Sequence, residues 1–207
     1  AKPGDTIVIP SGVYMESNIR IDKPLTILGK GNPVIDGEKK NEILLVTSDG
    51  VTIEGLTIRN GGYSSYNDIA AIRVVNANGV KIKNNIIEQT FFGSYVQHGS
   101  RITIEGNKVR SNAAVELNSA NGIHCWKSDQ MMIRDNSITG HRDGIYFEFV
   151  TRSVVKGNHC YRNVRYGLHF MFSNDDRYEW NQFSENGAGV AVMFSHRVTM
   201  IRNRFMN

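Results

Sequence analysis

An asparagine that recurs about every 22 residues most constrains what this chain can fold into. Each copy lies three residues after an apolar residue, at Asn85, Asn107, Asn136, Asn158, Asn181 and Asn203. The successive spacings are 22, 29, 22, 23 and 22 residues, and Leu56 occupies the equivalent position 29 residues before Asn85. A glycine series runs in phase with it, at Gly93, Gly122, Gly144, Gly167 and Gly189. Such a fixed period indicates a repeat architecture.

A period near 22 residues is too short for two helices but accommodates two or three short strands. Segments such as 51–53 and 102–104 alternate between apolar and polar residues, as strands do. The 21 Asn and 20 Gly residues disfavour a helical bundle, because both residue types are poor helix formers. Leucine is too scarce for a leucine-rich repeat. We therefore predict an all-β parallel β-helix of about 22 residues per coil, in which the Asn side chains hydrogen-bond from coil to coil.

The repeat predicts one β-helix domain over residues 1–207, with irregular first coils at 1–49 and regular coils at 50–207. Both 29-residue spacings place their extra residues in the same turn, which predicts two protruding loops, from Asn60 to Ala70 and from Ser111 to Asn121. Insertions in solenoids often map to the binding face. Since the chain ends in mid-coil, we expect C-terminal coils and a cap to be missing.

Alternation divides the strand after each glycine into inward and outward positions. The first and third residues after the glycine are mostly apolar and include Cys125, and Cys160 falls in another apolar column. We predict that both thiols are small buried hydrophobic groups. Two cysteines are also too few for a disulfide scaffold.

The outward positions of the same strands carry unusual side chains. One column holds Tyr95, His124, Tyr146, His169 and Ala191, and the next holds Gln97, Trp126, Glu148, Met171 and Met193. Because neighbouring coils lie about 4.8 Å apart, we expect His169, Met171 and Met193 to form an exposed triangle with His124 and Glu148 on one flank. Thioether and imidazole ligands together suit copper, and thioethers especially suit Cu(I).

A metal site is one of three interpretations of these outward residues. Met and aromatic side chains also suit a dry surface for a protein partner, and incidental exposure is the third. The first two are compatible, because a metal-transfer site must also be a docking site.

Several function classes are disfavoured. The net charge of +4 without a basic block argues against nucleic-acid binding, and no apolar run approaches the ~20 residues that span a bilayer. Glycoside hydrolysis needs two facing carboxyls, but Glu148 is the lone carboxylate in the outward columns, and His141, Arg142, Asp143 and His169 form a weak acid–base set. We expect no enzymatic activity, with a carbohydrate-active β-helix (polysaccharide lyase, hydrolase or uronate epimerase) as the alternative.

Three segments carry a family resemblance. They are Asp-Gly-Ile-Tyr-Phe-Glu-Phe-Val (143–150), Arg-Tyr-Gly-Leu-His-Phe-Met-Phe-Ser (165–173) and Asn-Gly-Ala-Gly-Val-Ala-Val-Met-Phe-Ser (186–195). They closely resemble the NosD family, the periplasmic β-helix proteins of nitrous-oxide reductase maturation. The opening segment 2–14 is similar to the entry of carbohydrate-binding and sugar-hydrolase β-helices.

The resemblance implies a right-handed parallel β-helix in the periplasm without an activity of its own. It implies work alongside an ABC transporter, made of a membrane subunit and an ATPase, and copper delivery through a lipoprotein copper chaperone to nitrous-oxide reductase. No family motif marks the copper ligands, so His169, Met171, Met193, His124 and Glu148 are predicted from the columns and from their place in the family-like segment.

Overall fold

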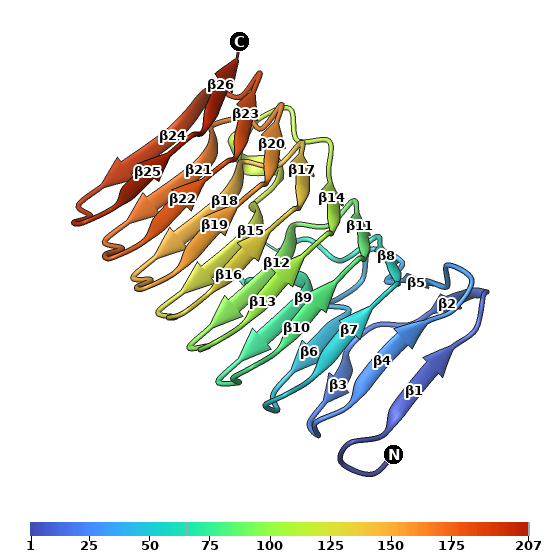
Figure 1. Ribbon diagram of the computed structural model, residues 1–207. Helices are drawn as coiled ribbons and strands as arrows, with labels where there is room; N and C mark the ends of the chain where they lie inside the picture. The colour runs from blue at the N-terminus through green and yellow to red at the C-terminus, as the bar shows by residue number, and fades with distance from the viewer. Residues whose placement is uncertain (65, 207) are drawn as a thin grey trace.

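The chain is a parallel β-solenoid whose coils stack from one end to the other, with the two termini at opposite ends (Figure 1). The computed structural model describes residues 1–64 and 66–206, and of Asn118 the backbone alone. Each coil contributes one strand to each of three parallel sheets, except that the last described coil supplies strands to two of them, and corresponding strands of successive coils pair in register. The predicted all-β parallel solenoid is confirmed.

The first sheet, sheet A, has nine strands. They are β1 (Thr6–Ile9), β4 (Thr26–Gly29), β7 (Thr52–Glu54), β10 (Lys81–Lys83), β13 (Thr103–Glu105), β16 (Met132–Arg134), β19 (Val154–Lys156), β22 (Arg177–Glu179) and β25 (Thr199–Ile201). Its outward side chains carry charges of both signs, which pair between coils, as in Arg134–Glu105 and Lys156–Glu179.

Sheet B also has nine strands. They are β2 (Val13–Met15), β5 (Val34–Asp36), β8 (Thr57–Arg59), β11 (Ile86–Glu88), β14 (Lys108–Arg110), β17 (Ser137–Thr139), β20 (His159–Tyr161), β23 (Gln182–Ser184) and β26 (Arg204–Met206). The short strands leave room for sharp corners on either side, so that each coil closes within about 22 residues.

Sheet C has eight strands, and its later members are the longest in the molecule. They are β3 (Ile19–Ile21), β6 (Leu44–Val46), β9 (Ala70–Val75), β12 (Phe92–Gln97), β15 (Asn121–Trp126), β18 (Asp143–Glu148), β21 (Tyr166–Met171) and β24 (Ala188–Met193). The in-phase glycines lie at the start of these strands because the coils approach closely there. A Cβ atom at Gly144 would lie 2.6 Å from the carbonyl oxygen of Gly167.

The interior is a continuous apolar core that runs the length of the solenoid. Its largest fully buried side chains include Phe147, Phe170 and Phe183. Cys125 and Cys160 are completely buried as predicted, and burial raises the pKa of both thiols. Val192, predicted to be a core residue, is 47% exposed because β24 is the edge strand of sheet C.

The corner between sheets A and B holds the predicted ladder of asparagines. The backbone N–H and the Nδ2 of Asn107 donate to Oδ1 of Asn136 at 2.9 and 3.0 Å, and Nδ2 also donates to the Ile82 carbonyl. Asn136 repeats this pattern toward Asn158. At the near end the Leu56 N–H donates to Asn85 Oδ1, which confirms the position assigned to Leu56.

A second, shorter ladder lies at the corner between sheets B and C. Asn163 donates from N and Nδ2 to Asn186 Oδ1 at 3.0 and 2.9 Å, and the His141 N–H donates to Asn163 Oδ1 at 3.1 Å. Two residues past β14 and β11, the equivalent positions hold Asn112, which is exposed, and Thr90, which is buried. The ladder is therefore interrupted where the two long loops leave the coils. The second loop contains the 3-10 helix η1 (Glu116–Asn118).

Within the described residues, no helix is long and apolar enough to cross a membrane.

Candidate functional site on sheet C

A stacked row of aromatic and imidazole rings runs along the outer face of sheet C. Ring centroids are 4.5 Å apart from Tyr95 to His124, 4.7 Å from His124 to Tyr146 and 4.5 Å from Tyr146 to His169. In-register pairing of β12, β15, β18 and β21 places these side chains one above another. The row points outward, yet all four rings are almost fully buried because they cover one another.

The prediction that His169 belongs to an exposed triangle is wrong, since this residue is only 2% exposed. Its ring lies between Tyr146 and the edge-on ring of Tyr166, and its Nδ1 is 3.5 Å from Asp143 Oδ2. Alternation gives the face on which a side chain lies, but neighbouring rings decide whether solvent reaches it.

Asp143, the first residue of β18, is the electrostatic centre of this buried cluster. Arg165 donates from Nε and Nη2 to its two carboxylate oxygens at 2.9 and 2.6 Å. Burial alone would raise the pKa of Asp143, but the hydrogen bonds from Arg165 and His169 outweigh it and lower that pKa. The carboxylate therefore stays ionised. Asp143 and Arg165 together hold the aromatic row in place at its His169 end.

The structure brings two of the predicted ligands, His124 and Glu148, close together. His124 Nε2 lies 3.6 Å from Glu148 Oε2, and neither ring nitrogen of His124 has a hydrogen-bond partner among the described residues. Burial lowers the pKa of His124, and the nearby Glu148 carboxylate only partly opposes this. At neutral pH the imidazole is uncharged, which is the form that binds metals.

The two predicted thioether ligands are also neighbours. Met171 pairs in register with Met193 and, on its other side, with Glu148, and all three side chains are half-buried. The structure thus places Glu148, Met171 and Met193 in one row at the C-terminal ends of β18, β21 and β24, with His124 adjoining Glu148. His169 does not belong to this row, because its ring is buried between Tyr146 and Tyr166.

Each member of the row is followed by a phenylalanine at the next corner. Phe149 stacks on Phe172 at 5.1 Å, and Phe172 stacks on Phe194 at 5.0 Å. All three have positive φ angles near 50° and expose much of their surface. Bulky residues rarely adopt this conformation, so the molecule holds an apolar ridge, Phe149–Phe172–Phe194, in solvent beside the methionines.

No group of three or more His, Cys, Asp or Glu side chains with metal-binding geometry is found in the described ranges 1–64 and 66–206. Any metal held here would depend on thioether sulfur as well as on Glu148 and His124. Such a donor set fits a soft monovalent ion better than a hard divalent cation.

A pocket of about 370 Å³ opens beside His124 and Glu148. Its floor includes Tyr146 and Arg142, and the first inserted loop contributes Asp68 and Tyr66. Burial raises the pKa of Tyr146 to about 12, so its hydroxyl remains a hydrogen-bond donor. Residues of both inserted loops line the pocket. This agrees with the expectation that insertions in solenoids lie at the binding face.

The sequence columns missed Arg165 and Asp68. Arg165 precedes β21, where alternation assigns no direction, and Asp68 lies in an inserted loop whose path the repeat does not specify. The signal that could have found Arg165 is the buried acid at Asp143, since a buried carboxylate is generally paired.

Comparison with known proteins finds relatives of the same architecture. The chain is 30% identical over 129 residues to the probable ABC transporter binding protein NosD of Pseudomonas aeruginosa. The alignment covers 61% of this chain and 30% of that protein. The NosD protein of Stutzerimonas stutzeri is 28% identical over 138 residues, covering 66% of this chain and 31% of the relative. The matched part thus spans about a third of these curated relatives.

A solved structure shares the fold at low sequence identity. The catalytic domain of a GH87 α-1,3-glucanase, in complex with nigerose, superposes with a TM-score of 0.78 and 14% identity, covering 96% of this chain and 40% of that one. This likeness concerns the fold alone. The model of the right-handed beta helix region matches residues 70–207, and the chain therefore belongs to the right-handed β-helix family.

Proposed function

We propose that this chain is part of a periplasmic accessory protein that works with an ABC transporter and a copper chaperone to deliver copper to nitrous-oxide reductase. The similarity to two NosD proteins supports it. The observation that carries it is the in-register row of Glu148, Met171 and Met193 with His124 alongside, whose ring nitrogens have no hydrogen-bond partner among the described residues. Two thioethers with an imidazole or a carboxylate suit Cu(I), which in this role is cargo.

The Phe149–Phe172–Phe194 ridge supports the docking half of this role. An exposed apolar surface beside a metal site gives a partner protein a place to bury area while the ion changes hands. The transporter subunits, the chaperone and the reductase are the partners that this proposal names. The protein then needs no catalytic activity of its own.

Anaerobic titration with Cu(I) against a competing chelator tests the copper site. We expect the wild-type chain to take one equivalent and the double variant Met171→Leu/Met193→Leu to lose it, since Leu keeps the volume but not the sulfur. Met15→Leu is the matched control, because Met15 is an exposed methionine in sheet B at the other end of the solenoid. Unchanged stoichiometry in the double variant would rule the site out.

The pocket beside Glu148 favours a second candidate, a carbohydrate-active enzyme. Asp68 brings a second carboxylate to the pocket that holds Glu148, and Arg142 and His124 offer a cation and a base. Turnover of a uronate polymer or an α-glucan that disappears in Glu148→Gln would favour this candidate over the first. We expect no turnover by the wild type or by Glu148→Gln.

A further inference from the structure

The pocket on the outer face of sheet C holds charged side chains of both signs that have no ionic partner. Arg142 lines it just before β18 begins, Glu148 lines it where β18 ends, and Asp68 lines it from the first inserted loop. Among the described residues neither Arg142 nor Asp68 forms an ion pair, and Glu148 lies within ion-pair distance only of the uncharged His124 imidazole. A ligand that carries both a positive and a negative group would match these charges.

The strand itself keeps the opposite charges apart. Arg142 and Glu148 lie at the two ends of β18, so their Cα atoms are about 20 Å apart at about 3.3 Å per residue. All three charges nevertheless act on one imidazole. Burial lowers the pKa of His124 and Arg142 lowers it further, whereas Glu148 and Asp68 oppose this. The charges therefore surround a common space without pairing with one another.

Solvent, and hence a ligand, reaches all three charged groups. Asp68 is exposed, Arg142 is half-buried, and the Glu148 side chain is 29% exposed. Arg142 donates one weak hydrogen bond, from Nη2 to Asn121 Oδ1 at 3.4 Å, which leaves its Nη1 donors for a ligand carboxylate. The ring nitrogens of His124 are closed off from solvent, so a ligand contacts the charges and not the imidazole.

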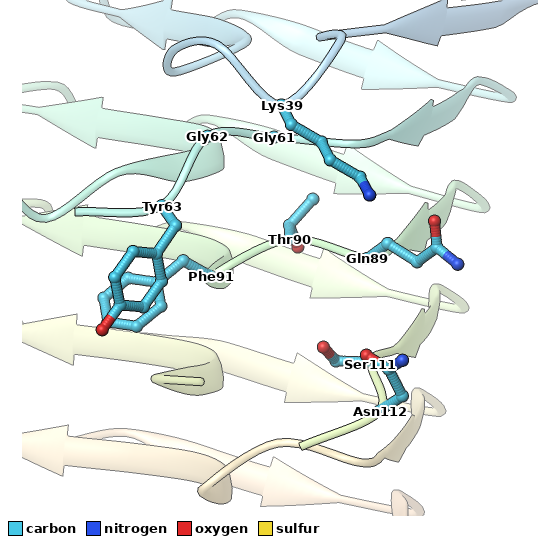
Figure 2. A pocket seen from close by; sticks show the side chains of 9 residues that line it. All are labelled: Lys39, Gly61, Gly62, Tyr63, Gln89, Thr90, Phe91, Ser111 and Asn112. Atoms are coloured by element: carbon cyan, nitrogen blue, oxygen red, sulfur yellow. The ribbon is translucent and has the colours of Figure 1, made fainter. Parts of the chain in front are cut away.

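The other large side chains of the lining are aromatic, and they are held in place. They are Tyr66, Phe91, Phe92 and Tyr146. Phe91 contacts Phe92 edge to face at 5.3 Å and Tyr63 edge to face at 4.9 Å (Figure 2). The Tyr63 hydroxyl donates to the Leu117 carbonyl at 3.2 Å, which ties the first inserted loop to the second. This aromatic wall suits a ligand with a large apolar or aromatic side chain.

Phe91 also lines a smaller pocket, of about 250 Å³, at the corner between sheets B and C (Figure 2). Lys39 is the one charged residue among the described residues of that lining. The corner pocket therefore lacks the combination of both charges and an aromatic wall that distinguishes the larger pocket.

We propose that the larger pocket binds an α-amino acid with an aromatic side chain. The ligand carboxylate pairs with Arg142, and its ammonium group pairs with Asp68 and Glu148. Its ring packs against Phe91 and Phe92. The volume of about 370 Å³ lies within the range of about 300–1,000 Å³ typical of small-molecule pockets. This inference goes beyond copper delivery and does not depend on it, since neither methionine predicted as a copper ligand is among the described lining residues.

Calorimetric titration with three ligands of nearly equal size tests the proposal. They are phenylalanine, phenethylamine, which lacks the carboxylate, and 3-phenylpropionate, which lacks the ammonium group. We expect saturable binding of phenylalanine and at least about tenfold weaker binding of each of the other two, as expected for the loss of one charge-assisted contact.

Two variants assign each charge of the ligand to its partner. Arg142→Gln should weaken the binding of phenylalanine about tenfold and leave that of phenethylamine unchanged, because phenethylamine has no carboxylate. Asp68→Asn should weaken phenylalanine severalfold and leave 3-phenylpropionate unchanged, because that ligand has no ammonium group. Arg20→Gln is the matched control, because Arg20 is an exposed arginine of β3, the edge strand at the other end of sheet C.

Three results would overturn the proposal. They are no saturable binding of phenylalanine, equal affinity for phenylalanine and either of its two analogues, and an equal loss in Arg142→Gln and Arg20→Gln. Equal affinity for phenethylamine, for example, would mean that the pocket binds cations alone. Urea unfolding of each variant confirms that the solenoid is intact.

Discussion

Two corners of the solenoid hold ladders of hydrogen-bonded polar side chains, but one ladder is continuous and the other is interrupted. At the corner between sheets A and B, every coil from Asn85 to Asn203 supplies an asparagine, and the ladder is unbroken. At the corner between sheets B and C, the ladder covers only His141, Asn163 and Asn186 before the inserted loops interrupt it. The first corner is specialised for stability. The second gives up hydrogen bonds and gains two loops and a pocket.

The largest loss of stability is expected when one rung of the complete ladder is removed. Asn136→Ala should lower the free energy of unfolding by about 3 kcal/mol, because the buried backbone N–H of Asn107 loses its acceptor and the Ile104 carbonyl loses the Asn136 amide. Urea unfolding measures the loss. A loss below that of an ordinary exposed substitution would show that the ladder is not a source of stability.

The third corner, between sheets C and A, gives an intermediate test. Its interior column is apolar at Ile102 and Met131, but then holds Ser153 and Asp176, and the Ser153 N–H donates to Asp176 Oδ1 at 2.9 Å. Burial raises the pKa of Asp176 from 3.8 to about 7, despite that hydrogen bond. Asp176 therefore imitates a ladder asparagine with a carboxyl group.

Asp176→Asn should change the pH dependence of stability. Between about pH 4 and pH 7 the folded state holds a proton that the unfolded chain has released, so the free energy of unfolding of the wild type falls as pH rises through this window. The variant lacks this titration and should be about 2 kcal/mol more stable than the wild type at pH 8, with the advantage vanishing below pH 4. Parallel pH profiles would contradict the assigned protonation.

The smallest effect is expected at the interruption itself. Thr90→Val replaces a buried hydroxyl that has no partner among the described residues by a methyl group of similar size, so the free energy of unfolding should rise by about 1 kcal/mol. Denaturation in urea gives the value. A loss comparable to that of Asn136→Ala would mean that the Thr90 hydroxyl is bonded in the folded protein.

The same contrast explains what could be predicted from the sequence. The complete ladder repeats one residue type at nearly constant spacing, so period, coil register and the burial of Cys125 followed from it. The second ladder mixes His141, Asn112 and Thr90 among its positions, and the insertions change the spacing, so no column revealed it.

The candidate site was predictable only in part, for a physical reason. Pairing in register brought Met171 beside Met193, as expected from the repeat. The burial of His169 was missed because it depends on contacts with Tyr146 and Tyr166 that alternation does not describe. Asp68 reaches its pocket from an inserted loop, where no periodic rule applies.

The complete ladder also makes the length of the molecule a discrete quantity. Every rung offers the same acceptor on one side and the same donors on the other, as Asn107, Asn136 and Asn158 show. Removing the 22 residues from 137 to 158 would bring Asn136 against Asn181, with every type of bond kept. Removing only about half a coil would place the N–H and Nδ2 donors of Asn136 opposite residues other than an asparagine, and these bonds would be lost. Evolution and protein engineering can therefore lengthen or shorten this scaffold only in steps of one coil.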